Sequence, residues 1–180
     1  MTLRPIDSLP SQRDAVEEAM RHLDLEAFSE IVRMLREQRG ATVWTAGNGG
    51  SAANASHLAA HLRECGFTAI CVPESVALLT ATSNDYRYED SMWRAGGLSM
   101  LKNGDVVIAL SCSGRSPNIL ALLKEARRVG MVRLGLFGFP ETCLAKHDCH
   151  AALVVQSEDY GAIEDAHSMV IHALAKELKA

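Results

Sequence analysis

Two glycine- and serine-rich stretches contain the residue types that bind an anion. The first, GNGGS, covers residues 47–51, and the second, SCSGRS, covers residues 111–116. Each follows a short apolar run and precedes a helical pattern, so each is expected to open a helix. A helix N-terminus presents unpaired N–H groups and a partial positive charge, which attract an anion. Glycines let the backbone approach closely, and serine hydroxyls add donors without bulk.

The second stretch gives the stronger prediction of a phosphate site. Ser111, Ser113 and Ser116 offer three hydroxyls close together in the sequence. Ser116 is expected to be the N-cap of the following helix, with Pro117 at the first helical position, where its missing N–H costs nothing. The first stretch, taken alone, is equally compatible with an ordinary turn.

The first stretch also has the G-x-G-x-x-A spacing of a dinucleotide-binding loop. Such a loop requires an acidic residue at the end of the next strand, and Glu74 matches that position poorly. No G-K-[ST] sequence follows, which excludes a P-loop. The two stretches together therefore suit a terminal monophosphate better than a pyrophosphate.

Two histidines, His57 and His61, follow the first stretch in an alanine-rich helical segment. At about 100° per residue they lie about 40° apart and share one face of the helix. This spacing occurs in zinc-binding helices, although most isolated pairs of this kind are packing or surface residues. The stretch CLAKHDCH, residues 143–150, fits no standard zinc template, and we expect no metal there.

The elements that must position these residues follow an alternating pattern. The helical patterns fall at 51–64, 74–82, 90–101, 117–129 and 162–178, after an N-terminal pair at 12–22 and 25–38. Continuous apolar runs, which suit strands buried on both faces of a parallel sheet, fall at 42–45, 69–72, 106–110, 134–137 and 152–155. Asp24 is expected to cap the second helix and Gly40 to end it. The pattern predicts a three-layer α/β sandwich with a five-stranded parallel sheet and appended N-terminal helices.

Composition limits the classes of function. The 180 residues, 48% of them hydrophobic, predict a single domain over residues 1–180. The net charge of −4 argues against a nucleic-acid partner. No apolar run is long enough to span a bilayer, and the N-terminal residues lack the apolar core of a signal peptide. The five cysteines are expected to be reduced thiols in a cytoplasmic protein that binds no membrane.

Four segments, in order, resemble the sugar isomerase (SIS) domain family and, within it, the phosphoheptose isomerases. They are GNGGSAANASH, SNDYRYED (83–90), SCSGRSPNIL (111–120) and IEDAHSMVIH (163–172). The resemblance implies an aldose–ketose isomerase of a phosphosugar, acting through a cis-enediol, with sedoheptulose 7-phosphate as the first substrate to test. It also implies a homotetramer whose active sites lie at subunit boundaries. The helical segment 1–40 is then expected to pack against partner subunits.

The resemblance also assigns the site residues. Substrate and phosphate contacts fall on Asn48, Gly49, Gly50, Ser51, Asn84, Asp85, Ser111, Cys112, Ser113 and Ser116. Some family members bind Zn²⁺ through four positions, which correspond here to His57, His61, Glu164 and His172. If the two helices face each other, three imidazoles and one carboxylate converge, and these ligand types suit zinc.

The chain departs from the family pattern at two of these positions. His61 stands where the family has a glutamate, and Glu164 stands where it has a glutamine. Glu164 is our candidate for the catalytic base and His172 for the acid, whereas His61 is either a metal ligand or the base. A closed four-ligand metal site would leave no position for substrate. His167, three residues after Glu164, is expected to be a packed or solvated histidine.

A non-catalytic SIS protein is the alternative function. Such a protein binds a sugar phosphate or serves as an interaction scaffold, as does a family member that associates with the bacterial replication initiator. The retained His57, His61, Glu164 and His172 argue for a working site, because a scaffold has no need of them.

Overall fold

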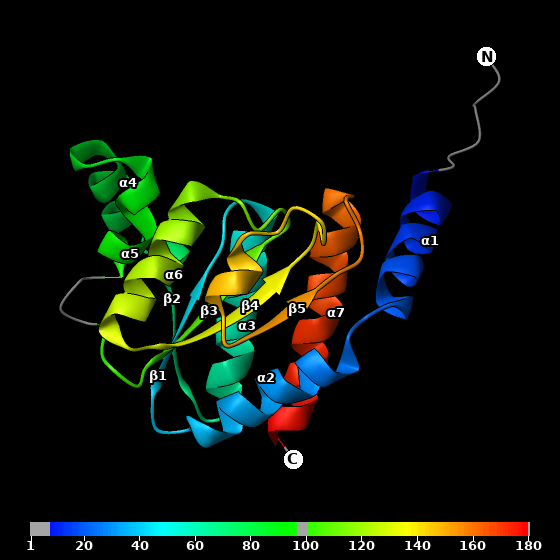
Figure 1. The fold of residues 1–180 in the computed structure, drawn as a ribbon, viewed down its shortest axis with the longest axis horizontal. Coiled ribbons are helices and arrows are strands. Elements are labelled where there is room, and N and C mark those ends of the chain that lie inside the picture. The colour runs from blue at the N-terminus through cyan, green and yellow to red at the C-terminus, as the bar shows by residue number, and fades with distance from the viewer. Residues whose placement is uncertain (1–7, 97–100, 180) are drawn as a thin grey trace.

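The predicted five-stranded parallel sheet is present in the computed structural model, which describes residues 8–96 and 101–179 (Figure 1). The strands are β1 (Thr42–Ala46), β2 (Thr68–Cys71), β3 (Val106–Ser111), β4 (Val132–Phe137) and β5 (Ala151–Val154). All pairings are parallel, in the order β2-β1-β3-β4-β5. Every residue of the central strand β3 is buried, which explains its continuous apolar run.

Helices cover both faces of the sheet, so the predicted three-layer α/β sandwich is confirmed (Figure 1). One face packs against α2 (Leu25–Glu37), α3 (Gly50–Glu64) and α7 (Tyr160–Lys179), and the other against α5 (Ser91–Ala95) and α6 (Pro117–Val129). The remaining elements are α1 (Ser8–Arg21), α4 (Val76–Asp85) and the 3₁₀ turns η1 (Val72–Glu74), η2 (Tyr88–Asp90) and η3 (Ala145–Asp148). α1 lies outside the sandwich, along α7.

Two boundary predictions differ from the structure. The helix predicted at 90–101 is η2 followed by the short α5, and residues 97–100 lie outside the described residues. The helix predicted at 74–82 starts after η1 and continues to Asp85. The pair Asn84–Asp85 therefore belongs to the last turn of a helix instead of a loop.

The two ends of α2 are determined by local hydrogen bonds and backbone conformation. The Asp24 side chain accepts hydrogen bonds from the N–H groups of Glu26 and Ala27, so this predicted N-cap is confirmed. The prediction that Gly40 ends the helix is wrong. Gln38 caps α2 with φ of −102°, a conformation that requires no glycine, and Gly40 lies in the turn beyond.

The chain order places the two anion-binding stretches side by side. β1 lies between β2 and β3, and its chain leaves through α3 toward β2, while β3 arrives on its other side. The loops that follow β1 and β3 therefore diverge from adjacent strands at the same edge of the sheet. Such a topological switch point is where open α/β sheets bind ligands.

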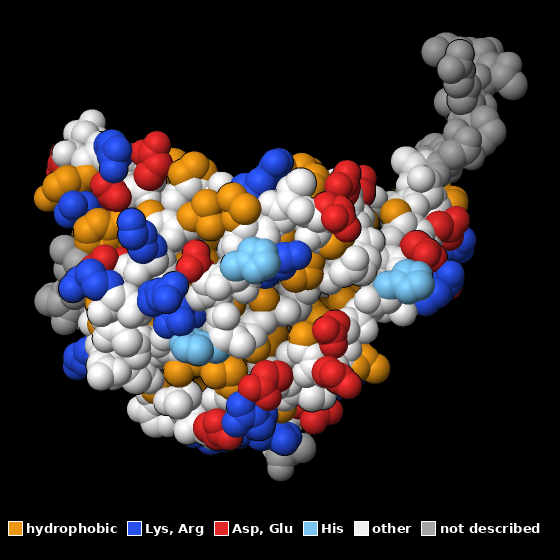
Figure 2. Space-filling view, viewed as in Figure 1, with side chains coloured by type: hydrophobic (Ala, Val, Ile, Leu, Met, Phe, Trp, Pro, Cys, Tyr) orange, Lys and Arg blue, Asp and Glu red, His pale blue; other side chains and the backbone are white. Residues whose placement is uncertain are grey.

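None of the helices within residues 8–96 and 101–179 has both the length and the apolar character needed to cross a bilayer. On the face shown in Figure 2, acidic and basic side chains are interspersed. This distribution agrees with the small net charge of −4.

Candidate active site

A cavity of about 110 Å³ lies where the two loops meet. Its lining comes from both loops and from the start of α7: Asn48, Ser51, Ser111, Cys112, Ser113, Ser116, Tyr160 and Glu164. Six of these residues are in the substrate- and phosphate-binding set expected from the sequence. The N-termini of α3 and α6 both open at this cavity, so it combines helix-end charge with hydroxyl donors.

The serine loop keeps its hydroxyls available to a ligand. Ser116 is the N-cap residue of α6, yet its side chain makes no capping hydrogen bond. Its Oγ instead lies 3.4 Å from the Oγ of Ser111, which accepts a hydrogen bond from the Gly114 N–H at 3.2 Å. Gly114 has φ of +60°, and a Cβ there would lie 2.3 Å from the Cys143 Sγ. Only glycine therefore permits this loop conformation.

The first loop is fixed by a network of side-chain amides. Asn48 and Asn118 exchange two hydrogen bonds, with nitrogen–oxygen distances of 2.9 and 2.8 Å. The Tyr88 hydroxyl donates to the Asn48 Oδ1 at 3.0 Å. Asn118 and Tyr88 were not expected from the sequence, because neither lies in a glycine-rich loop. Their contacts arise because the tertiary structure places α6 and η2 next to the first loop.

The Glu164 carboxylate points into this cavity. Its Oε1 lies 3.7 Å from the Cys112 Sγ, and a Cβ at Gly50 would lie only 2.2 Å from its Oε2. Glycine at position 50 thus leaves the space that the carboxylate fills. The Asn54 side chain donates to the Glu164 backbone carbonyl at 2.8 Å and joins α3 to α7 at this level.

Cys112 is a buried thiol at the centre of these contacts. Its Sγ lies 3.7 Å from the Ser51 Oγ, and its side chain is 4% exposed. Burial raises the pKa of the Cys112 thiol to about 11; the nearby Glu164 charge adds to this rise, whereas the Ser51 contact opposes it. The thiol is therefore protonated at neutral pH.

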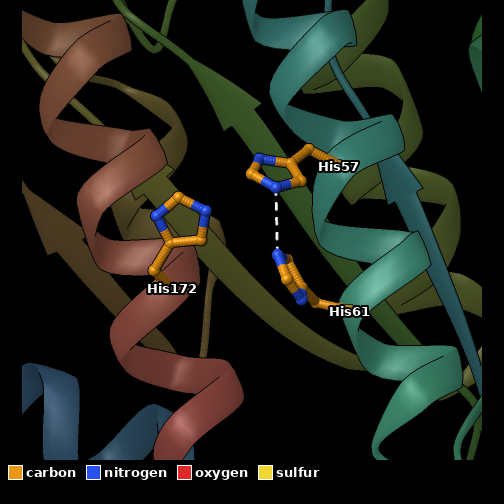
Figure 3. Close-up of side chains that lie close together, drawn as sticks. All are labelled: His57, His61 and His172. Atoms are coloured by element: carbon orange, nitrogen blue, oxygen red, sulfur yellow. Dashed lines mark hydrogen bonds between the residues drawn. The ribbon is translucent and has the colours of Figure 1, made fainter.

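Three histidines form a second group, further along α3 and α7. His57 and His61 project from α3 toward His172 on α7 (Figure 3), and one ring nitrogen of each lies within 4.8 Å of the others. The Nε2 atoms of His57 and His61 are 2.9 Å apart. Burial, and then the neighbouring His61 and His172 rings, lower the pKa of His57. Three imidazoles that converge in this way are a donor set for a divalent transition metal.

The orientation of His61 favours a ligand role. Its Nε2 faces His57, whereas its Nδ1 lies 3.5 Å from the Oε2 of Glu64, a longer contact than a good hydrogen bond. A carboxylate on the far nitrogen is the usual partner of a metal-bound imidazole. Nδ1 is also buried without a hydrogen-bond partner. The His61 Nε2 is hydrogen-bonded to the His57 Nε2, so an ion bound here would replace that hydrogen bond.

Glu164 is not part of the histidine group. It precedes His172 by eight residues on α7, which corresponds to about 12 Å along a helix axis. The four positions that the resemblance assigns to zinc are thus divided between the imidazole group and the serine-lined cavity. Three imidazoles gather in one group, and the carboxylate lies in the serine-lined cavity.

Two other expected positions lie apart from the cavity. Asn84 and Asp85 are exposed at the end of α4, where the Asn84 amide donates to the Asp85 carboxylate at 3.1 Å. His167 is fully buried and bonds through Nε2 to the Phe137 carbonyl at 3.1 Å, so it is a packed histidine. Burial lowers the pKa of His167 to about 4.

Comparison with known proteins decides the family. The family model described as "SIS domain" matches residues 11–138. This chain belongs to the SIS domain family. It is 35% identical over 159 residues to a phosphoheptose isomerase of a Bradyrhizobium species, covering 84% of this chain and 78% of that protein. It is 36% identical over 146 residues to phosphoheptose isomerase 1 of Campylobacter jejuni, covering 77% of each.

Solved structures of this SIS group have the same fold. The phosphoheptose isomerase of Neisseria gonorrhoeae superimposes with a TM-score of 0.84 and 25% identity, covering 95% of this chain and 94% of that one. The likeness therefore extends beyond the matched family segment, to the α7 region that carries Glu164 and His172.

Proposed function

We propose that this SIS protein is a phosphosugar aldose–ketose isomerase that converts sedoheptulose 7-phosphate to a heptose 7-phosphate. The observation that carries the proposal is the Glu164 carboxylate, aimed into a cavity lined by serine hydroxyls at two helix N-termini. The names of the similar proteins support the same reaction.

The serine loop binds the phosphate in this proposal. Ser111, Ser113 and Ser116 supply hydroxyl donors, and the first turn of α6 supplies backbone N–H groups beyond Pro117. Ser51 and Asn48 contribute from the first loop. In this proposal the cavity of about 110 Å³ takes the phosphate at its serine-loop end, and the sugar extends along α7 so that C1 and C2 lie within reach of Glu164.

Glu164 is the proposed base. Along α7 the order is Tyr160, Glu164 and His172, so the carboxylate comes between the serine loop and the imidazole group. The carboxylate accepts a proton from C1 of the open-chain ketose, giving the cis-enediolate with its charge on O2. A proton then passes from the O1 hydroxyl to O2, and the carboxylate returns its proton to C2, which leaves the carbonyl of the aldose at C1. Proton transfer by a positioned side chain typically contributes about 10²- to 10⁴-fold to the rate.

The three imidazoles are proposed to hold a divalent cation such as Zn²⁺. When bound, such an ion polarises a carbonyl oxygen as a Lewis acid. His57, His61 and His172 match the three-ligand pattern of sites that keep one position open, and Glu164 stays outside the set. In this proposal His61 is a metal ligand and not the base. His172, the one ligand of this set that α7 supplies, then binds the ion instead of acting as the acid expected from the sequence.

The protein is further proposed to act in the cytoplasm as a homotetramer. All five cysteines are free, as expected for a reducing compartment. α1 and α7 border a groove lined by Val16, Met20, Met169 and His172, so a partner subunit packed on α1 would approach the imidazole group. Light scattering coupled to size-exclusion chromatography measures the assembly state.

One experiment tests the function. The purified protein is incubated with sedoheptulose 7-phosphate and, separately, with fructose 6-phosphate and ribulose 5-phosphate, with and without a chelator, and NMR follows the aldose. We expect turnover of the heptose, which falls on chelation and returns with added zinc. Binding of these phosphates without any turnover, with or without zinc, would support the non-catalytic alternative and reject the enzyme.

A further inference from the structure

We propose that Cys112 is a positioning residue, whose thiol donates a hydrogen bond to Glu164 and holds the carboxylate in the serine-lined cavity. The catalytic consequence rests on the proposed isomerase function, whereas the hydrogen bond itself does not.

Three polar atoms surround the Cys112 sulfur. They are the Glu164 Oε1 and the Ser51 Oγ, each at 3.7 Å, and the Tyr160 carbonyl oxygen at 3.9 Å. A thiol has one proton to donate. The carboxylate is the nearer of the two oxygens that can only accept, and a charged acceptor forms the stronger bond. The S–H group is therefore directed to Glu164, which leaves the sulfur to accept from the Ser51 hydroxyl.

The protonation state of the thiol makes it a lasting donor. Burial of the thiol disfavours the charged thiolate, so the proton stays on the sulfur in the neutral range. The side chain is buried at 4% exposure, so water does not compete strongly for the S–H. Weak donors of this kind gain importance where the alternative is an unpaired group.

The opposite side of the carboxylate is bounded by Gly50. A Cβ at this position would lie 2.2 Å from the Oε2 and 2.3 Å from the Cδ of Glu164, so the carboxylate rests directly on the start of α3. Glu164 is thus held between a backbone surface and a donor. A flexible side chain with only the backbone contact would be free to adopt other rotamers and leave this position.

Kinetics with a conservative variant test the positioning role. Cys112→Ala removes the donor, and we expect kcat to fall about fivefold with KM unchanged, the size of effect that one hydrogen bond gives. Cys112→Ser keeps an O–H donor at the same place and should recover part of the lost kcat. Cys71→Ala, which removes a buried thiol outside the cavity, is the matched control. An unchanged kcat in Cys112→Ala, or an equal fall in the alanine and serine variants, would overturn the role.

Infrared spectroscopy tests the hydrogen bond without any turnover. The difference between the wild-type and Cys112→Ala spectra isolates the S–H stretch of Cys112 from those of the other four cysteines. A carboxylate acceptor lowers this frequency, so we expect it to rise in Glu164→Ala. An unchanged frequency in Glu164→Ala would reject the bond and point to the Tyr160 carbonyl as the acceptor. If the wild-type protein isomerises no sugar phosphate, the proposed function fails, and this band still decides where the thiol donates.

Discussion

The serine-lined cavity and the imidazole group use the same two helices in opposite ways. The cavity lies at the N-terminal ends of α3 and α7 and takes most of its polar groups from short side chains and backbone. The imidazole group lies within the same helices and consists entirely of long side chains that meet across the gap (Figure 3). The serine-lined cavity is therefore defined by where the chain turns into its helices. The imidazole group is defined by which side chains α3 and α7 carry.

This difference bears on the two positions at which the resemblance implies a departure from the family pattern. A loop held by glycines and strand ends binds phosphate through geometry, so its residue types are tightly constrained. A helix position accepts another residue without any change in the backbone. The two departures that the resemblance implies, His61 and Glu164, both fall on helix positions. The chemistry of the site can thus change while the phosphate loop stays the same.

Among the changes to these two regions, removal of the Glu164 carboxylate is expected to have the largest effect on the catalytic rate. Glu164→Gln should lower kcat about 1,000-fold, within the range for loss of a general base, while KM changes little. NMR or coupled assays of the aldose measure the rate. Glu158→Gln, which changes an exposed glutamate outside the cavity, is the control and should leave the rate unchanged. Near-normal rates in Glu164→Gln would transfer the base role to His61.

Loss of one imidazole is expected to affect metal binding and not the cavity. His57→Asn and His172→Asn should each weaken zinc binding by more than about 100-fold, because even the outer partners of metal ligands change affinity about 10- to 100-fold. Glu164→Gln should leave zinc affinity within a few-fold of wild type, since its carboxylate lies outside the group. Competition titrations with a chromogenic chelator measure these affinities, with the exposed His22→Asn as control. Strong zinc loss in Glu164→Gln would return the carboxylate to the metal site.

Filling the space beside Glu164 should show how far catalysis depends on the position of the carboxylate, because the carboxylate itself is kept. Gly50→Ala adds a Cβ where the carboxylate now lies, and the flexible glutamate is expected to move away. A displacement of about 1 Å can lower a rate by up to about 100-fold, so we expect kcat to fall between 10- and 100-fold. The free energy of unfolding in urea should change by less than about 1 kcal/mol, since alanine suits a helix. Gly40→Ala, with no atom near its added Cβ, is the matched control, and equal kcat values in the two variants would contradict the placement.

Local signals explain what the sequence could predict. The bounds of α6 agree with the predicted 117–129, since Ser116 and Pro117 begin the helix and Gly130, in a left-handed conformation, ends it. The meeting of the two loops followed from the rule for strand ends in a parallel sheet. The shared face of His57 and His61 followed from helix geometry alone.

Tertiary contacts explain what the sequence could not predict. The direction of the Glu164 carboxylate depends on the space at Gly50 and on the Cys112 thiol, which come from two other parts of the chain. Asn84 and Asp85 were expected near the sugar, but α4 continues through them and leaves them exposed. Tyr88 reaches Asn48 instead, because the chain turns back at η2.

His167 offers the smallest test, since it has the same residue type as the imidazole group and lies on the same helix. It is fully buried with a pKa lowered to about 4, against about 6.5 in an unfolded chain. Between these values the unfolded state binds the extra proton, so stability falls as pH drops from 6.5 to 4, by at most about 1.4 kcal/mol per pH unit. His167→Gln should remove this contribution to the pH dependence of the free energy of unfolding, which urea denaturation at several pH values measures. This holds whatever the substitution does to stability at pH 7. His57, whose pKa is also lowered, contributes a slope of the same sign, which both proteins share. Equal slopes in the two proteins would mean that His167 already accepts a proton in the folded state and is not the packed neutral histidine that distinguishes it from His172.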